Sequence, residues 1–138
     1  MEKHFGEYLI SDDKSMIQGT RVYELLLTTP WASKRSMETM QKAIENSLCF
    51  GVYKDGVQIA FGRCVTDNAT MFWLADVIVD EKYRGQGLGK EFLQFILGHK
   101  DIAHLRGILF TSDAHELYER YGFVREQEIV MLRHPAAI

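Results

Sequence analysis

Several features of secreted, membrane-bound or disulfide-rich proteins are missing from this sequence. Its 138 residues include two cysteines and two prolines. Cys49 and Cys64 lie inside apolar runs without CxxC spacing, so we expect small buried side chains and not a redox or metal site. No stretch approaches the ~18 apolar residues of a spanning helix, and the first residues lack an apolar signal core. We therefore expect a cytoplasmic protein that has no membrane partner.

An excess of one charge sign is also absent. The formal net charge is −3, and acidic and basic residues are interspersed. Nucleic-acid binders usually carry a basic face, so we expect no nucleic-acid partner. The five histidines are scattered without ligand spacing, so we expect no metal. No repeat or linker divides the chain, and its length suits a single domain over residues 1–138.

The hydrophobic pattern predicts a mixture of helices and strands. Asp55-Gly56 is a strong hairpin signal between two runs of strand formers. Residues 11–13 (Ser-Asp-Asp) offer N-cap oxygens to a first helix, which should stop near Pro30. The expected strands cover 5–10, 48–53, 57–65, 71–79, 105–110, 123–124 and 129–132. The expected helices pass through 16–26, 36–46, 88–97 (ending at Gly98) and 114–121. This order indicates an α+β fold with a mixed sheet.

A glycine-rich segment lies between a predicted strand and an amphipathic helix. Its residues are Arg84, Gly85, Gln86, Gly87, Leu88, Gly89 and Lys90. A helix N-terminus presents backbone N–H groups without internal partners, and glycines let an anion approach them closely. Arg84 and Lys90 add positive charge at the rim. This segment, called the glycine turn below, therefore predicts a site for a phosphate or pyrophosphate.

Two other phosphate-binding loops do not fit the spacing of the glycine turn. A Walker A loop has four residues between its first Gly and its Gly-Lys pair, and Ser or Thr follows. Here three residues separate Gly85 from Gly89-Lys90, and Glu91 follows. A dinucleotide fingerprint would need a glycine where Lys90 stands and would begin from an early βαβ unit.

The glycine turn resembles the signature of the GNAT superfamily of acyl-CoA-dependent N-acyltransferases, Arg/Gln-x-x-Gly-x-Gly/Ala after the fourth strand of that fold. Arg84, Gly87 and Gly89 match this signature. A second family block, a helix with Tyr-x-x-x-Gly-Phe, is matched by Ala114, Tyr118, Gly122 and Phe123. The resemblance covers 71–124 and is weak over the first 50 or so residues. It implies a GNAT-like three-layer fold, with a mixed central sheet of about six to seven strands and helices on both faces.

The resemblance also implies acetyl-CoA as cosubstrate and direct attack by an amine within a ternary complex. In the family, backbone N–H groups of the strand before the turn meet the thioester carbonyl, and the matching residues are Val77, Ile78 and Val79. Tyr118 would stand beside the sulfur as general acid, since a phenol of pKa ~10 stays protonated at neutral pH. Thr-Ser-Asp stands where many members have an Asn that holds the pantetheine arm, and Asp113 is expected to substitute. A non-catalytic acyl-CoA-binding or sensing module is the alternative.

The general base and the acceptor remain open at this level. Asp76 interrupts the apolar run 71–79, where a carboxylate must find a partner or take a raised pKa. It could accept the proton of the amine or simply bond Arg63 or the backbone. Glu24 is a weaker candidate for the base. The acceptor, a small-molecule or peptide amine, should bind over residues 20–50 and the three successive strands expected over 48–53, 57–65 and 71–79. The candidate lining residues are Trp31, Phe50, Phe61, Arg63 and Trp73. The oligomeric state is also open, with a homodimer among the alternatives.

Overall fold

The computed structural model describes residues 1–135. They divide into two compact units, Met1–Ile108 and a smaller unit that begins at Leu109. None of the helices in this described part is long and apolar enough to cross a membrane.

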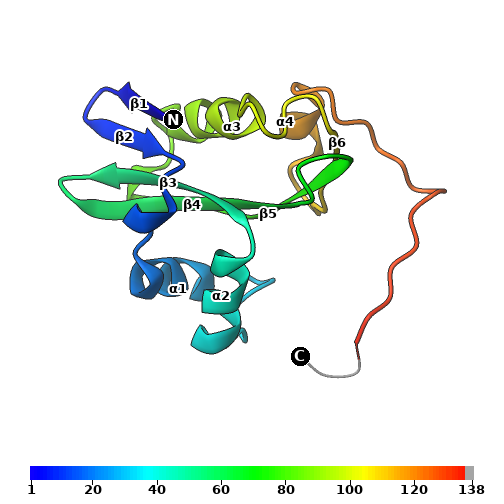
Figure 1. Ribbon diagram of the computed structural model, residues 1–138, viewed down its shortest axis with the longest axis horizontal. Helices are drawn as coiled ribbons and strands as arrows, with labels where there is room; N and C mark the ends of the chain where they lie inside the picture. The colour runs from blue at the N-terminus through cyan, green and yellow to red at the C-terminus, as the bar shows by residue number, and fades with distance from the viewer. Residues whose placement is uncertain (136–138) are drawn as a thin grey trace. The chain divides into compact units, whose positions relative to one another are not determined.

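A six-stranded mixed sheet forms the centre of the larger unit (Figure 1). The strands lie side by side in chain order, and each neighbouring pair is antiparallel except β5 and β6, which are parallel. The strands are β1 (Glu2–Phe5), β2 (Tyr8–Ser11), β3 (Leu48–Lys54), β4 (Val57–Thr66), β5 (Met71–Val79) and β6 (Arg106–Ile108). Asp55 and Gly56 join β3 to β4 with positive φ angles of 50° and 79°, so the predicted hairpin is confirmed. The α+β class with a mixed sheet is confirmed as well.

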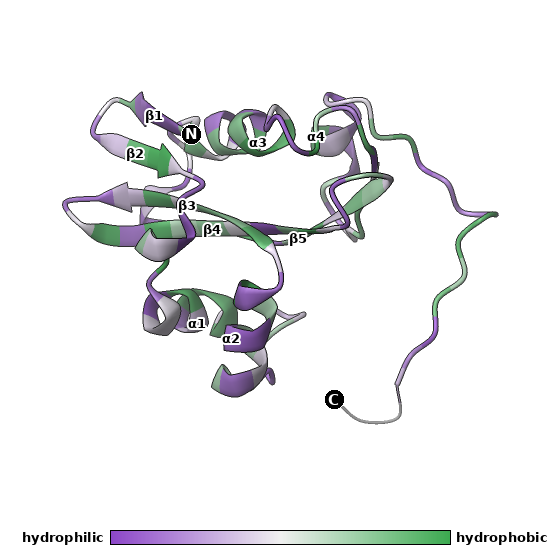
Figure 2. Cartoon of the chain, viewed as in Figure 1, coloured by the Kyte–Doolittle hydropathy of each residue, from purple (hydrophilic) through white to green (hydrophobic). Residues whose placement is uncertain are grey.

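Helices cover both faces of this sheet. α1 (Gly19–Leu27) and α2 (Met37–Glu45) lie on one face, and α3 (Leu88–Leu97) lies on the other (Figure 1). Each of the three helices carries both polar and apolar surface (Figure 2), as expected for helices that pack one side on a sheet. The predicted start of α2 is confirmed, because the Ser36 hydroxyl accepts a hydrogen bond from the N–H of Thr39 at 3.1 Å.

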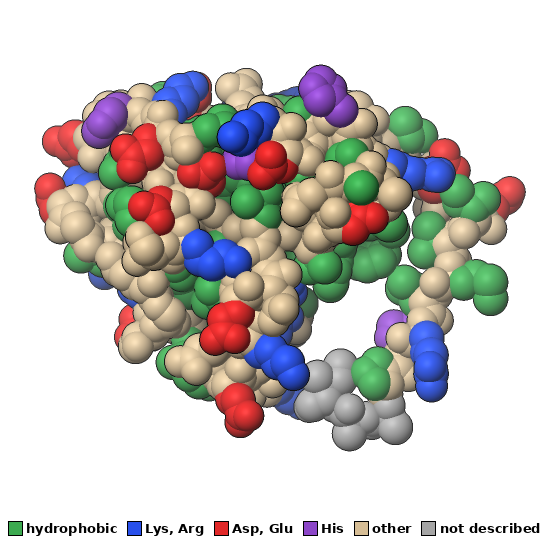
Figure 3. Space-filling view, viewed as in Figure 1, with side chains coloured by type: hydrophobic (Ala, Val, Ile, Leu, Met, Phe, Trp, Pro, Cys, Tyr) green, Lys and Arg blue, Asp and Glu red, His purple; other side chains and the backbone are tan. Residues whose placement is uncertain are grey.

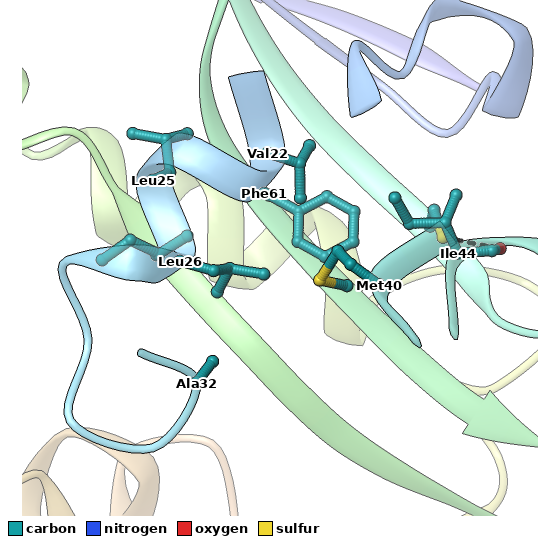
Figure 4. Packing of buried hydrophobic residues seen from close by; sticks show 9 residues of the cluster. Val22, Leu25, Leu26, Ala32, Met40, Ile44 and Phe61 are labelled. Carbon is teal, nitrogen blue, oxygen red and sulfur yellow. Dashed lines mark hydrogen bonds between the residues drawn. The ribbon is translucent and has the colours of Figure 1, made fainter. Parts of the chain in front are cut away.

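The core is built on both faces because successive side chains of a strand point in opposite directions. Phe61 of β4 belongs to a cluster with Val22 from α1 and Met40 from α2 (Figure 4). The neighbouring Gly62 points toward α3, where an added Cβ would lie 3.0 Å from the Cδ1 atom of Ile96. The missing side chain at position 62 therefore lets α3 pack close to the sheet.

The N-terminal region corrects one expectation. The predicted strand over 5–10 is two short strands, β1 and β2, joined by a turn in which Gly6 has a φ of 57°. The carboxylate of Asp13 caps a 3-10 turn over Lys14–Met16, and α1 begins only at Gly19. Gln18, the N-cap of α1, still has an extended backbone, and its N–H donates to the Gln58 side chain at 2.9 Å. The strand before the glycine turn is consequently the fifth of the chain.

The smaller unit corrects a second expectation. Its helix α4 (His115–Glu119) is shorter than predicted, and the strands expected over 123–124 and 129–132 are wrong, since residues 120–135 contain no strand. Val124, Ile129 and Met131 are exposed, and apolar side chains stand out along this extended segment (Figure 3). Strand formers alone do not make a strand, because their backbone N–H and C=O groups need a neighbouring strand.

Candidate functional site

The glycine turn has a backbone that requires glycine at two positions. Gly85 and Gly87 both have a φ of 81°, a left-handed conformation that strains a residue with a Cβ. Gly87 is the N-cap of α3, and the next residue, Leu88, is fully buried beneath the helix. The glycine turn therefore leads from the end of β5 into α3, and the first residue of α3 is packed in the core.

The first turn of α3 offers free backbone donors. The N–H of Glu91 makes the first intrahelical bond, to the carbonyl of Gly87 at 3.2 Å, so helix geometry leaves the N–H groups of residues 88–90 ahead of it without an intrahelical acceptor. Apart from its chain neighbours and the backbone of its own helix, no atom lies within 4 Å of a Cβ built on Gly89, which leaves room for a ligand there. The Nζ atom of Lys3 lies 2.8 Å from the Glu91 carboxylate and offsets the only acid in this turn.

Neighbouring residues hold the glycine turn in place. The Nε atom of Arg84 donates to the carbonyl of Val79 at 3.0 Å, and the Tyr8 hydroxyl of β2 donates to the Gln86 side chain at 2.8 Å. Lys90 is exposed on the first turn of α3. The structure thus brings the predicted positive charges and glycines together at one helix N-terminus, where they fit an anionic phosphate ligand.

Strand β5 carries a β-bulge at Asp76. Phe61 pairs with Ile78 and Arg63 pairs with Ala75, so two residues of β5, Asp76 and Val77, lie opposite Gly62. Asp76 takes a φ of 54°, the left-handed conformation that aspartate tolerates better than most residues. β6 pairs only with Met71–Trp73. On that side, residues 77–79 therefore present an edge that pairs with no strand of the described chain.

The Asp76 carboxylate is enclosed by three donors. Its side chain is 2% exposed. One oxygen accepts from Arg35 at 2.6 Å and from Arg63 at 2.7 Å, and the other accepts from the Trp31 indole at 3.0 Å. Burial opposes ionisation, but the hydrogen bonds and charges of the two arginines outweigh it and hold the pKa of Asp76 below its ordinary value. Of the two roles that the sequence left open, this geometry favours the ion pair over the proton acceptor.

The aromatic residues considered for an acceptor pocket separate into two groups. Trp31 and Arg63 contact Asp76, and the guanidinium of Arg63 lies 5.5 Å from the centre of the Trp73 ring, which joins this residue to the same group. Phe50 and Phe61 are fully buried core residues, so the expectation that they line a pocket is wrong. Arg35, which sequence reasoning missed, joins the first group from the loop between α1 and α2. No motif marks it.

Glu24, the weaker candidate for the base, lies on the exposed side of α1. Its carboxylate is 3.5 Å from a guanidinium nitrogen of Arg21. Arg21 also pairs with Asp80, the residue that caps the short turn after β5. Glu24 therefore belongs to a surface ion-pair group on α1, and this placement favours a solvated helix face over a catalytic role.

The smaller unit holds the two remaining predicted residues. Tyr118 on α4 is half-buried and packs edge-on against Phe123, with ring centres 6.0 Å apart. Burial, with the nearby charge of Asp113, raises the pKa of Tyr118 above its ordinary value, so its phenol keeps its proton at neutral pH. Asp113 is exposed, and the Thr111 hydroxyl accepts from the N–H of Ala114 at 3.0 Å. The roles of Tyr118 and Asp113 stay predictions.

Neither cysteine is placed to act as a nucleophile. Burial raises the pKa of Cys49 to about 11 and that of Cys64 to about 12, and the thiolate is the reactive form. Within residues 1–135, no group of three or more His, Cys, Asp and Glu side chains is arranged to hold a metal ion.

The chain matches a family model described as an acetyltransferase (GNAT) domain over residues 45–125. That range is more than half of the chain and contains the glycine turn, the β5 bulge and Tyr118.

Individual proteins agree with this match. A solved structure of a candidate GNAT-family acetyltransferase from Xanthomonas campestris pv. campestris has a TM-score of 0.89 and 37% identity, covering 96% of each chain. An uncharacterised ycf52-like N-acetyltransferase of Prochlorococcus marinus is 32% identical over 110 residues, which are 75% of this chain and 61% of that protein. A candidate acetyltransferase of Gibberella zeae is 24% identical over 163 residues, covering 96% of this chain and 92% of its own length.

Proposed function

Because the chain belongs to the GNAT acetyltransferase family, we propose that it transfers the acetyl group of acetyl-CoA to a primary amine within a direct ternary complex. The observation that carries this proposal is the glycine turn at the N-terminus of α3. Two glycines in left-handed conformation, an open space above Gly89 and the free N–H groups of residues 88–90 make a cradle for a pyrophosphate.

The donor would be held by the glycine turn and the β5 edge together. The N–H groups of residues 88–90 bind the pyrophosphate, with Arg84 and Lys90 supplying positive charge. The thioester carbonyl meets a backbone N–H group from among residues 77–79, whose edge no strand of residues 1–135 covers on the β6 side. Such a fixed donor stabilises the negative charge that develops on the carbonyl oxygen during attack.

The chemistry then needs one attack and two proton movements. The neutral amine adds to the carbonyl carbon, and the tetrahedral intermediate collapses with cleavage of the C–S bond. In this proposal Tyr118 gives its proton to the departing thiolate, and the amine loses its extra proton to water. The raised pKa of Tyr118 supports a residue that is protonated when the thiolate leaves. The protonated, buried cysteines favour direct transfer over a covalent acyl-enzyme.

Turnover with and without Tyr118 tests this function. The enzyme is supplied with acetyl-CoA and a broad panel of amines, and both thiol release and the acetylated product are measured. Tyr118→Phe should lower kcat by roughly a hundredfold or more and leave CoA affinity unchanged, since a general acid contributes about 10²–10⁴. Tyr121→Phe, a matched change two positions beyond α4, should leave both unchanged. Unchanged turnover in Tyr118→Phe would remove Tyr118 from the mechanism.

Binding of the donor is tested separately from turnover. Free CoA at about 100 times its dissociation constant should add roughly 2.7 kcal/mol to the free energy of unfolding. Stabilisation by CoA without any acetylated product would indicate the alternative, a non-catalytic acyl-CoA-binding module. No stabilisation by CoA would refute the proposed function.

A further inference from the structure

Two arginines share one carboxylate on the α1–α2 face of the sheet. Arg35 and Arg63 both donate to the same oxygen of Asp76, which stays ionised because its pKa is lowered. Neither arginine has a second acidic partner among residues 1–135. The cluster of Trp31, Arg35, Arg63, Trp73 and Asp76, called the Arg–Trp cluster below, therefore carries a net charge of about +1.

The two arginines differ in their exposure and in how many of their nitrogens donate hydrogen bonds. Arg63 is 8% exposed, and a second nitrogen donates to the Ser47 hydroxyl at 3.2 Å. Arg35 is 21% exposed, and its Nε and Nη2 atoms have no hydrogen-bond partner in the described part of the chain. A guanidinium presents its donors in a planar fork that matches a carboxylate. Arg35 is thus the more accessible member of the pair, and two of its nitrogens remain available to bind a ligand.

The indoles add an apolar surface beside this charge. Trp31 is 55% exposed although its Nε1–H is fixed on Asp76. Trp73 is partly buried and stacks near Arg63. An exposed indole whose N–H is held by a part-buried hydrogen bond gives a preformed contact surface at little cost in side-chain entropy. The Arg–Trp cluster therefore combines an anion donor with an apolar wall.

The cluster lies next in the chain to the β5 edge. Asp76 directly precedes residues 77–79, and a strand advances roughly 3.3 Å per residue. Because Arg35 bonds Asp76, a ligand whose anionic group contacts Arg35 lies close to residues 77–79. The ligand atoms next to that anionic group would then lie near the proposed position of the thioester. A small molecule with its amine close to its anionic group fits this spacing.

We propose that the Arg–Trp cluster binds the carboxylate of a free amino acid, whose α-amine is the acetyl acceptor. This assignment of acceptor class rests on the proposed acetyltransferase function. Arg35 receives the carboxylate, and Trp31 and Trp73 contact an apolar side chain. A monoanion matches the single net positive charge, whereas a phosphate dianion would leave charge uncompensated.

Intrinsic fluorescence tests the site without catalysis, because the chain has two tryptophans and both belong to the cluster. The protein is titrated with leucine, with 3-methylbutylamine, which is leucine without its carboxylate, and with inorganic phosphate. Leucine should change the tryptophan emission and bind at least roughly tenfold more tightly than the amine, the usual effect of a charge-assisted hydrogen bond. Equal affinities, no change with leucine, or tighter binding of phosphate would overturn the assignment.

Substitution of Arg35 locates the carboxylate. Arg35→Gln should raise the KM for leucine roughly tenfold or more and leave the KM for 3-methylbutylamine within about twofold, since only leucine offers an anion to the guanidinium. Lys34→Gln removes the same charge from the adjacent exposed residue and should change neither KM. An equal rise of both KM values in Arg35→Gln protein that unfolds cooperatively in urea would contradict a carboxylate-binding role.

The two proposals fail in different ways. Efficient acetylation of simple amines with no preference for those bearing a carboxylate overturns the acceptor class and leaves the acetyltransferase function standing. Absence of stabilisation by CoA overturns the acetyltransferase function. In that case the fluorescence titration still decides whether the Arg–Trp cluster is a carboxylate site.

Discussion

Replacement of Asp76 by Asn would show how much the buried ion pair stabilises the larger unit. Asn has nearly the same shape as Asp and also tolerates left-handed backbone, so the change removes the charge without straining the φ of 54° at this position. Arg35 and Arg63, which now share one carboxylate oxygen, would be left as two neighbouring positive charges. Arg63 would suffer most because it is 8% exposed.

The expected loss in the free energy of unfolding is about 3 kcal/mol. Removing one partner of a buried ion pair typically costs 3–5 kcal/mol, and the partial exposure of Arg35 places this pair at the lower end. For a chain of this length, the loss corresponds to a fall of roughly 10 °C in Tm. Asp76→Ala should lose about 1 kcal/mol more, because alanine is strained at positive φ.

Urea unfolding at neutral pH measures this loss, provided that the slope m is unchanged. Asp55→Asn is the matched control, since Asp55 also has a positive φ of 50° but is exposed and makes no ion pair with any of residues 1–135. Its stability should stay within about 0.5 kcal/mol of the wild type. A loss below about 1 kcal/mol in Asp76→Asn would refute the assignment of Asp76 as a buried structural ion pair.

The pH dependence gives a second test of the same pair. A carboxylate with a lowered folded-state pKa stabilises the protein fully above its unfolded pKa of about 3.9 and loses this contribution as the pH falls through the folded pKa. The stability difference between wild type and Asp76→Asn should therefore be constant from neutral pH to about pH 5 and shrink below pH 4. A difference that grows on acidification would contradict this sign.

Three further predictions concern other parts of the larger unit. Gly87→Ala should lower the free energy of unfolding by about 1–2 kcal/mol, because the φ of 81° at this position strains alanine. The same change should weaken CoA binding measured by calorimetry. Gly89→Ala, which has open space around it, should change the free energy of unfolding by less than about 1 kcal/mol. Tyr8→Phe, which loses the hydrogen bond that braces the glycine turn, should weaken CoA binding by roughly 3- to 10-fold; unchanged binding would show that the brace has no effect. A thiol reagent should label neither Cys49 nor Cys64 in the native protein at neutral pH, because burial raises both pKa values, and should label both after unfolding.

Local signals explain the parts of the fold that the sequence predicted well. β5 begins and ends where its apolar run does, and α3 runs from Leu88 to the residue before Gly98, because turn residues and an amphipathic pattern mark these limits. The glycine turn was found for the same reason, since its backbone conformation depends on residues within a few positions of one another.

Contacts between distant residues explain what the sequence could not predict. Arg35 bonds Asp76, 41 positions away in the sequence, and Gln18 bonds Gln58, 40 positions away. No pattern in the neighbouring residues therefore predicts the role of Arg35 or the late start of α1. The ambiguity at Asp76 had the same origin, because a carboxylate in an apolar run takes its pKa from partners that only the fold supplies.

The bulge in β5 also reverses the phase of the strand. Before it, odd-numbered residues such as Trp73 and Ala75 pair with β4 residues on the α1–α2 face, and after it the even-numbered Ile78 occupies that face with Phe61. Backbone N–H groups alternate between the two sides of a strand in the same rhythm as the side chains. The extra residue at position 76 therefore decides which N–H groups point to the open edge just before the glycine turn. Deleting one residue here would turn residues 77–79 over, so that the N–H groups that now point to the open edge would point to β4 and the others would point to the edge.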